Sequence, residues 1–206
     1  TDWITHGGIL AGSAGRKSKA SIQSRNWIRH RSQPKLDGAL ELAEEYLTNV
    51  DRGVKLVMFA MDIETTERIG EALSDVTDDV YVVHSQVASS NRKKDQIVRQ
   101  RIDQFAAADH GVLIAPKLLD EGIDVPDAEV GINVAGTKTK LQLVQRMGRV
   151  LRKHADQQPQ FHHFVAVPDE HHIEGLDGKH YVQELNWVCE LGEAIGEQPS
   201  LEKAHV

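Results

Sequence analysis

Short apolar segments alternate with longer amphipathic segments along most of this chain, and this alternation restricts the fold more than any other feature. Residues 55–60, 80–84 and 161–167 are short, mostly apolar runs, which predicts strands. Elsewhere apolar residues recur at the helical steps of three and four. These series are Leu36, Leu40, Ala43, Leu47 and Val50, then Ile63, Ile69 and Leu73, and then Ile97, Val98, Ile102 and Phe105. Strands alternating with helices predict an α/β fold, a parallel sheet covered on both faces.

A polar turn lies between two further apolar strands within residues 112–134. It carries Asp120, Glu121, Gly122 and Asp124. The glycine lets the backbone pass close to a ligand, and the carboxylates accept hydrogen bonds. Ligands of open parallel sheets bind beyond the carboxyl ends of the strands, where this turn would lie. We therefore expect the turn to form part of a binding site.

Residues 145–152, with the sequence QRMGRVLR, separate two kinds of side chain when they are drawn as a helix. One face carries Gln145, Arg149 and Arg152, and we expect the opposite face, with Val144, Met147 and Leu151, to pack on the sheet. Guanidinium groups bind phosphate bidentately and keep their charge, so the first face suits a polyanion. Taken alone, an Arg-x-x-Arg pair is more often a solvated basic surface.

The order of the turn and the helix resembles the superfamily-2 helicases and translocases. The turn D-E-G-I-D-V-P resembles their motif V, QRMGRVLR resembles their motif VI, and the strand at 55–60 resembles motif IV. Further matches resemble the XPB-type (Rad25-type) DNA repair translocases and their archaeal relatives: Lys117, Asp120, Ile123, Asp124, Val125, Pro126 and Gly136. The chain departs from them at Ala115 and Pro116, where a Thr or Ser often donates to the nucleic-acid backbone. The resemblance covers residues 36–167.

This resemblance implies a RecA-like three-layer sandwich, the second of two motor domains that close around ATP. It assigns three sets of site residues. The catalytic set, which reaches the phosphates of ATP, is Arg149, Arg152 and Gln145. The nucleotide-binding set is Gly122, Asp124 and Glu121, with Asp124 at the ribose hydroxyls. The nucleic-acid-binding set includes Lys117, Thr137 and Lys138.

The chain carries no recognisable P-loop, the Gly-rich loop that cradles nucleotide phosphates. In the nearest candidate, residues 12–18, Arg16 stands between Gly15 and Lys17, and no apolar strand precedes it. Residues 169–172 spell D-E-H-H, but they follow motif VI, whereas the corresponding family motif belongs to the first motor domain. We therefore expect the P-loop and the Mg²⁺ ligands on a first motor domain, and no ATP hydrolysis by this chain alone.

Basic residues are clustered, although the net charge of the chain is −7. Most of them lie in residues 16–35, 91–101 and 138–153, where Asp95 is the one acidic residue. Such clusters can follow a phosphate backbone, so we expect a nucleic-acid partner, with DNA favoured, and contacts from Arg92, Lys93 and Lys94. The alternative for each cluster is a solvated helix face.

Two other functional classes compete with the motor. Neighbouring histidines at 162–163 and 171–172 could suggest zinc, but adjacent residues of a strand point to opposite faces, and no metal-binding spacing is present, so we expect no metal site. The domain could also be a non-catalytic nucleic-acid-binding or adaptor module that keeps the fold.

The expected organisation is a basic linker or arm at 1–33, the RecA-like domain at 34–175 and a helical extension at 176–206. A start at Thr1 suggests a fragment. The apolar runs are shorter than the roughly 20 residues that cross a bilayer, so we expect no membrane partner. The single Cys189 fits a reducing cytoplasm, and the resemblance favours a prokaryotic or archaeal source.

Overall fold

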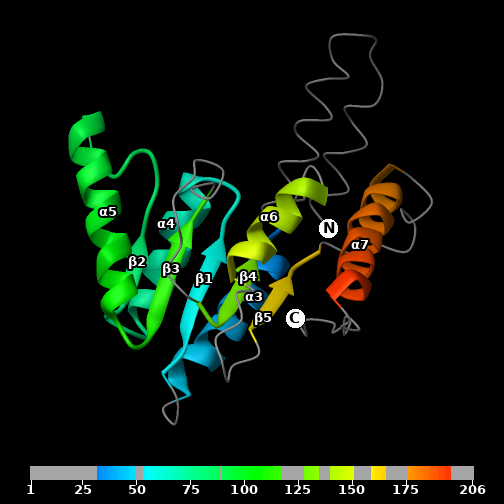
Figure 1. Cartoon of the computed structure of the whole chain (residues 1–206), viewed down its shortest axis with the longest axis horizontal. Coiled ribbons are helices and arrows are strands. Elements are labelled where there is room, and N and C mark those ends of the chain that lie inside the picture. Colours follow the sequence, from blue (N-terminus) through cyan, green and yellow to red (C-terminus); the bar gives the residue numbers. More distant parts are fainter. Residues whose placement is uncertain are drawn as a thin grey trace.

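A parallel sheet forms the centre of the molecule (Figure 1). The computed structural model describes residues 32–49, 53–88, 90–116, 128–134, 140–150, 159–165 and 176–195. The sheet has five strands in the order β2-β3-β1-β4-β5, and every neighbouring pair is parallel. The strands are β1 (Lys55–Phe59), β2 (Val80–Val82), β3 (Gly111–Ala115), β4 (Val130–Asn133) and β5 (Gln160–His163). The predicted strands and the parallel α/β sandwich are confirmed.

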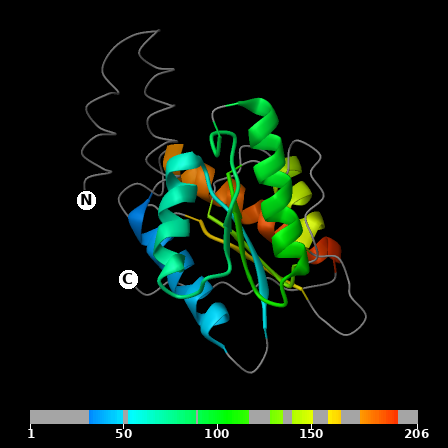
Figure 2. The same cartoon turned by 90° about the vertical axis from the view of Figure 1, so that its left-hand side faces the viewer.

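Helices cover both faces of the sheet, as the edge-on view shows (Figure 2). On one face lie α3 (Gln33–Thr48) and α4 (Ile63–Ser74), and on the other lie α5 (Asn91–Ala107), α6 (Lys140–Val150) and α7 (Leu176–Ile195). The predicted helical series at Leu36, Ile69 and Phe105 are buried. Among the described residues, no helix is both long enough and apolar enough to cross a membrane.

Local signals in the sequence start the helices and the third strand. Asp62 caps α4, because its carboxylate accepts a hydrogen bond from the backbone N–H of Thr65 at 2.9 Å. Ser90 caps α5 in the same way. Gly111 starts β3 with φ of +128°, and a Cβ there would lie 2.6 Å from the carbonyl oxygen of Asp79, so no larger residue fits. These positions fix where the elements begin relative to the sheet.

The packed face of α6 differs from the prediction. The helix itself is confirmed, but Val144 is 41% exposed, whereas its neighbour Leu143 and Arg146 are buried. Met147 is partly buried, and Leu151 lies outside the described residues. The prediction placed only apolar residues on the packed face, and it failed because a paired arginine occupies part of that face.

Arg146 reaches the core through a series of buried polar side chains. Its Nη1 donates to Oδ1 of Asn133 at 3.1 Å, and its guanidinium lies 5.9 Å from the centre of the Phe59 ring. The Asn133 side chain is 2.6 Å from Nδ1 of His163, and Nε2 of His163 is 2.9 Å from the Glu184 carboxylate. The side chains of Arg146, Asn133, His163 and Glu184 form what we call the buried polar chain, which links α6, β4, β5 and α7.

Burial keeps His163 neutral. Removal from solvent is the largest effect and lowers the pKa of His163 below its ordinary value. The hydrogen bond and charge of Glu184 oppose this change, and the positive charges of Lys35 and Arg146 add a smaller lowering. A neutral imidazole has one donor and one acceptor nitrogen. Nε2 therefore carries the proton and donates to Glu184, and Nδ1 accepts from Asn133. Every donor in the buried polar chain thus points from α6 towards α7.

The lowered pKa of His163 makes stability depend on pH. Above the ordinary histidine pKa of about 6.5 the ring is neutral in both the folded and unfolded states, so its contribution to stability is complete. Below that pH the unfolded chain binds a proton that the folded chain does not, and the free energy of unfolding should fall. Denaturant unfolding between pH 7.5 and 5 should show this decrease, and His163→Gln should reduce it. An identical pH dependence in the variant would contradict the assignment.

Adjacent residues of α6 should respond oppositely to the same substitution. Leu143→Asp places an unpaired carboxylate in the core and should destabilise the domain by more than about 3 kcal/mol. Val144→Asp, at an exposed position, should change the free energy of unfolding by no more than about 0.5 kcal/mol. Urea unfolding of both variants provides the measurement. Equal destabilisation would show that α6 is rotated differently on the sheet.

Candidate functional site

The candidate site lies along the edge where the parallel strands end. β1, β3, β4 and β5 end there at Phe59, Ala115, Asn133 and His163. α4 and α5 begin at the same edge, directly after the turns that follow β1 and β2 (Figure 1). Parallel sheets bind their ligands at this edge, because the connecting turns and the positive ends of the helices meet there.

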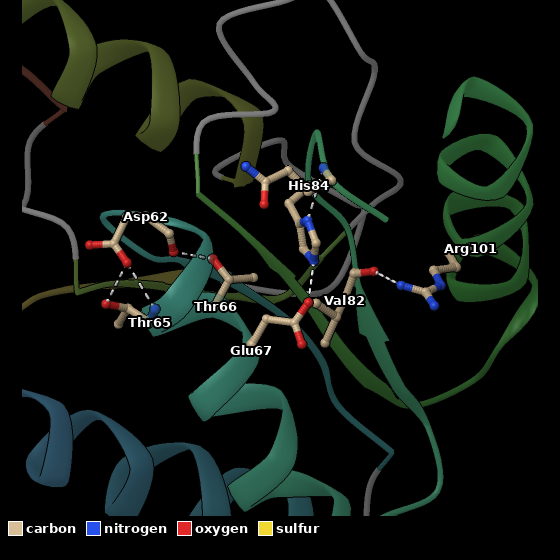
Figure 3. A network of polar contacts seen from close by, with 8 residues as sticks. Asp62, Thr65, Thr66, Glu67, Val82, His84 and Arg101 are labelled. Carbon is tan, nitrogen blue, oxygen red and sulfur yellow. Dashed lines mark hydrogen bonds and ion pairs between the residues drawn. The ribbon is translucent and has the colours of Figure 1, made fainter. Parts of the chain in front are cut away.

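His84 organises the turn between β2 and α5. It lies just beyond the end of the strand, and its side chain is only 3% exposed. Nδ1 accepts from the backbone N–H of Gln86 at 3.2 Å, so Nε2 carries the proton and donates to the Glu67 carboxylate of α4 at 2.5 Å (Figure 3). Arg101 of α5 donates to the carbonyl oxygen of Val82 in the same view. The His84 contact holds the turn before α5 against α4, and the Arg101 contact holds the second half of α5 against β2.

Basic side chains stand at the first turn of α5. Arg92 and Lys93 are exposed, and Lys94 is partly exposed with its Nζ 3.7 Å from the Asp95 carboxylate. Positive charge at a helix N-terminus is unfavourable, because the backbone N–H groups there already carry partial positive charge. No acidic residue in the first turn offsets it. The first turn of α5 therefore carries net positive charge.

The outer face of α6, where the sequence predicted a phosphate-binding face, carries both polar and apolar exposed residues. Gln145 and Gly148 are exposed, while Leu143 and Arg146 hold the opposite face on the sheet. Arg149 belongs to the same helix, one turn after Gln145, so its backbone position follows the predicted face. Gln145 therefore points away from the sheet. The buried polar chain anchors α6 in this orientation.

Most of the other predicted site residues lie outside the described part of the chain. These are Lys117, Glu121, Gly122, Asp124, Thr137, Lys138 and Arg152, and also the side chain of Arg149. The P-loop-like segment 12–18 and the D-E-H-H segment 169–172 lie outside it as well. The described strand β3 ends shortly before the predicted motif V turn, at the carboxyl edge of the sheet.

The histidines of β5 contact opposite faces of the sheet. Nε2 of His162 lies 2.9 Å from the hydroxyl of Tyr46 on α3, whereas His163 contacts Glu184 on α7. The two rings therefore do not point to one ion, as the alternation of a strand predicts. Within the described residues, no group of three or more His, Cys, Asp or Glu side chains is placed to hold a metal.

The sequence did not reveal the residues that support the site. Asn133, His163 and Glu184 are far apart along the chain, and only the parallel pairing of β4 with β5 brings the first two together. His84 and Glu67 likewise come from different elements. One signal was available: a polar residue at the end of an apolar strand, as Asn133 and His84 are, often lies at the functional edge of a parallel sheet.

Comparison with known proteins agrees with this architecture. Residues 38–154 match the helicase conserved C-terminal domain. The chain is 33% identical over 123 residues to the DNA 3'-5' translocase XPB2 of Sulfurisphaera tokodaii, a match that covers 59% of this chain and 24% of that protein. It is 26% identical over 129 residues to the putative ATP-dependent DNA helicase fml2 of Schizosaccharomyces pombe. That match covers 59% of this chain and 16% of that protein. The chain thus spans only a small part of these relatives.

Solved structures share the fold. The RNA helicase Prp28 from Chaetomium thermophilum superposes with a TM-score of 0.59 at 14% identity, covering 83% of this chain and 37% of that one. The C-terminal domain of the DEAD-box protein Dbp5 superposes with a TM-score of 0.53 at 18% identity. That match covers 77% of this chain and 78% of that one. The RecA-like fold predicted from the sequence is confirmed. Because the helicase C-terminal pattern occupies more than half of its length, the chain belongs to the helicase conserved C-terminal domain family of the superfamily-2 helicases.

Proposed function

We propose that this chain is the second motor domain of an ATP-dependent DNA helicase or translocase, and that α6 supplies the arginine side of an ATP site between two domains. The observation that carries the proposal is the orientation of α6. A buried arginine fixes its inner face, and Gln145 stands on its outer face next to the backbone position of Arg149. The P-loop and the Mg²⁺ ligands belong, in this proposal, to a first motor domain.

Charge stabilisation is the chemical role of α6. Phosphoryl transfer spreads negative charge over the γ-phosphate oxygens, and a positioned guanidinium lowers the energy of that transition state. Arg149 and Arg152 supply the guanidinium groups, and Gln145 orients the phosphates. Glu121 and Gly122 line the nucleotide and Asp124 holds its ribose hydroxyls. Positioning is essential because arginines on a freely rotating helix would lose most of this effect.

Nucleic acid binds along the same edge, through the first turn of α5. Arg92 and Lys93 are exposed there, and Lys117, Thr137 and Lys138 follow in the segments after β3 and β4. We favour DNA because the similarity to XPB2, named as a DNA translocase, is 33%, compared with 26% for the RNA helicase DBP3 of Kluyveromyces lactis. ATP binding closes the two domains and hydrolysis reopens them, which moves the strand.

Removal of the arginines should abolish turnover without unfolding the protein. In the full-length protein, Arg149→Ala and Arg152→Ala should each lower nucleic-acid-stimulated ATPase by about 10³-fold, since that is the usual effect of an arginine finger. The melting temperature should stay within a few degrees. The isolated chain is the control and should hydrolyse no ATP. Normal turnover in both variants would instead favour a non-catalytic adaptor.

Removal of charge at α5 should weaken nucleic-acid binding. Arg92→Ser combined with Lys93→Ser should reduce affinity and lower the slope of log affinity against log salt by about 1 for each phosphate that the protein no longer binds. The matched control is Arg68→Ser combined with Arg99→Ser, which removes the same charge from exposed positions of α4 and mid-α5. Fluorescence anisotropy over a salt series provides the measurement. Equal effects of the two pairs would show that only net charge matters.

A further inference from the structure

The buried polar chain can be satisfied in only one direction. At one end Arg146 has only donors, and at the other end the Glu184 carboxylate has only acceptors. Between them, the Asn133 amide and the neutral His163 ring each offer an acceptor on one side and a donor on the other. Reversing either group would bring two donors or two acceptors face to face. The groups at the two ends therefore fix how the amide is turned and which nitrogen of the ring carries the proton.

The acceptor end of the buried polar chain lies beyond the helicase pattern. The match ends at residue 154, whereas His163 belongs to β5 and Glu184 to α7. Their side chains are only 3% and 7% exposed, so water is not available as another partner. A buried N–H group that loses its acceptor is costly. An acceptor at position 184 therefore holds the proton of His163 on Nε2.

We propose that Glu184 is a positioning residue for ATP hydrolysis, and that it acts through the buried polar chain on the orientation of α6. The inference rests on the proposed function, in which α6 carries the arginines of the ATP site. A proton on Nδ1 of His163 would compete for Oδ1 of Asn133, or would turn the amide so that its NH2 group faces Arg146. Either change weakens the 3.1 Å contact between Arg146 and Asn133, the directional bond that sets the rotation of α6. Leu143 would still hold the helix on the sheet.

A change in the rotation of α6 should lower the rate of the chemical step rather than the binding of ATP. The arginines act on charge that develops in the transition state, so their contribution appears in kcat. A misplacement of about 1 Å can cost about 100-fold in rate, even when the altered residue is far from the chemistry. Glu184 should therefore affect kcat, although it lies on a helix that holds none of the residues assigned to the ATP site.

Two substitutions in the full-length protein separate the roles that Glu184 could have. Glu184→Gln keeps the size and an acceptor oxygen but removes the charge, so kcat of the nucleic-acid-stimulated ATPase should stay close to that of the unaltered protein. Glu184→Met keeps the size but offers only a weak acceptor, so kcat should fall by about 10- to 100-fold, with little change in the KM for ATP. Both substitutions remove the carboxylate that offsets the charges of Lys35 and Arg146, so both should lower the melting temperature. The rates are therefore compared at a temperature at which every variant is folded.

The position of the proton on His163 provides a readout that a purely structural role would not change. Nuclear magnetic resonance of ¹⁵N-labelled histidine distinguishes a protonated ring nitrogen from an unprotonated one, and the His163→Gln variant identifies the signals of this ring. We expect the proton on Nε2 in the unaltered chain and in Glu184→Gln. In Glu184→Met we expect a population with the proton on Nδ1, and the fall in kcat should accompany it.

Leu73→Ala is the control for lost stability, because it opens a cavity on the opposite face of the sheet and leaves the buried polar chain intact. It should lower the melting temperature without lowering kcat. If Glu184→Gln is as slow as Glu184→Met, the side chain acts through its charge, and if Glu184→Met turns over normally, the side chain only fills space. Either result, or a proton on Nδ1 in the unaltered chain, overturns this proposal, while an inactive Arg149→Ala leaves the proposed function standing. If Arg149→Ala keeps normal turnover, the proposed function fails, and this inference fails with it.

Discussion

Arg146 brings a positive charge beneath α6, and its compensation determines how the rest of the site is arranged. The Phe59 ring, the Asn133 side chain and, through His163, the Glu184 carboxylate surround it. Moving a charge out of water costs several kcal/mol, and apolar replacements of similar volume are often at least as stable. The value of such an arrangement is geometric: a directional hydrogen bond to Asn133 allows only one rotation of α6 on the sheet.

That rotation buries one face of α6 and leaves the opposite face exposed. The inner face meets the ends of β1 and β4 through Leu143 and Arg146, whereas Gln145 is exposed on the outer face. Glu184 extends the same control to α7, so an element outside the matched helicase region supports α6. The buried polar chain thus fixes which face of α6 is exposed.

Sequence reasoning found the fold because apolar runs and helical periodicity are local signals. The strands of the sheet and the helices α3 to α7 lie where these patterns predict them. It misplaced Val144 because periodicity assumes that charged residues face water, an assumption that Arg146 breaks with partners from other elements. Local patterns could not reveal the partnership of Asn133 with His163, which depends on strand pairing. The roles assigned to the residues of motifs V and VI stay predictions.

The contact between Arg101 and Val82 has a consequence for how wide the sheet can become. β2 is one of the two edge strands, and its bonds to β3 use Asp79 and Val83, so the Val82 carbonyl points outward. An outward carbonyl on an edge strand invites a further strand from another molecule. Arg101 already donates to that carbonyl from α5. The helix thereby occupies an outward carbonyl of β2, which makes that edge less available to a strand from another molecule.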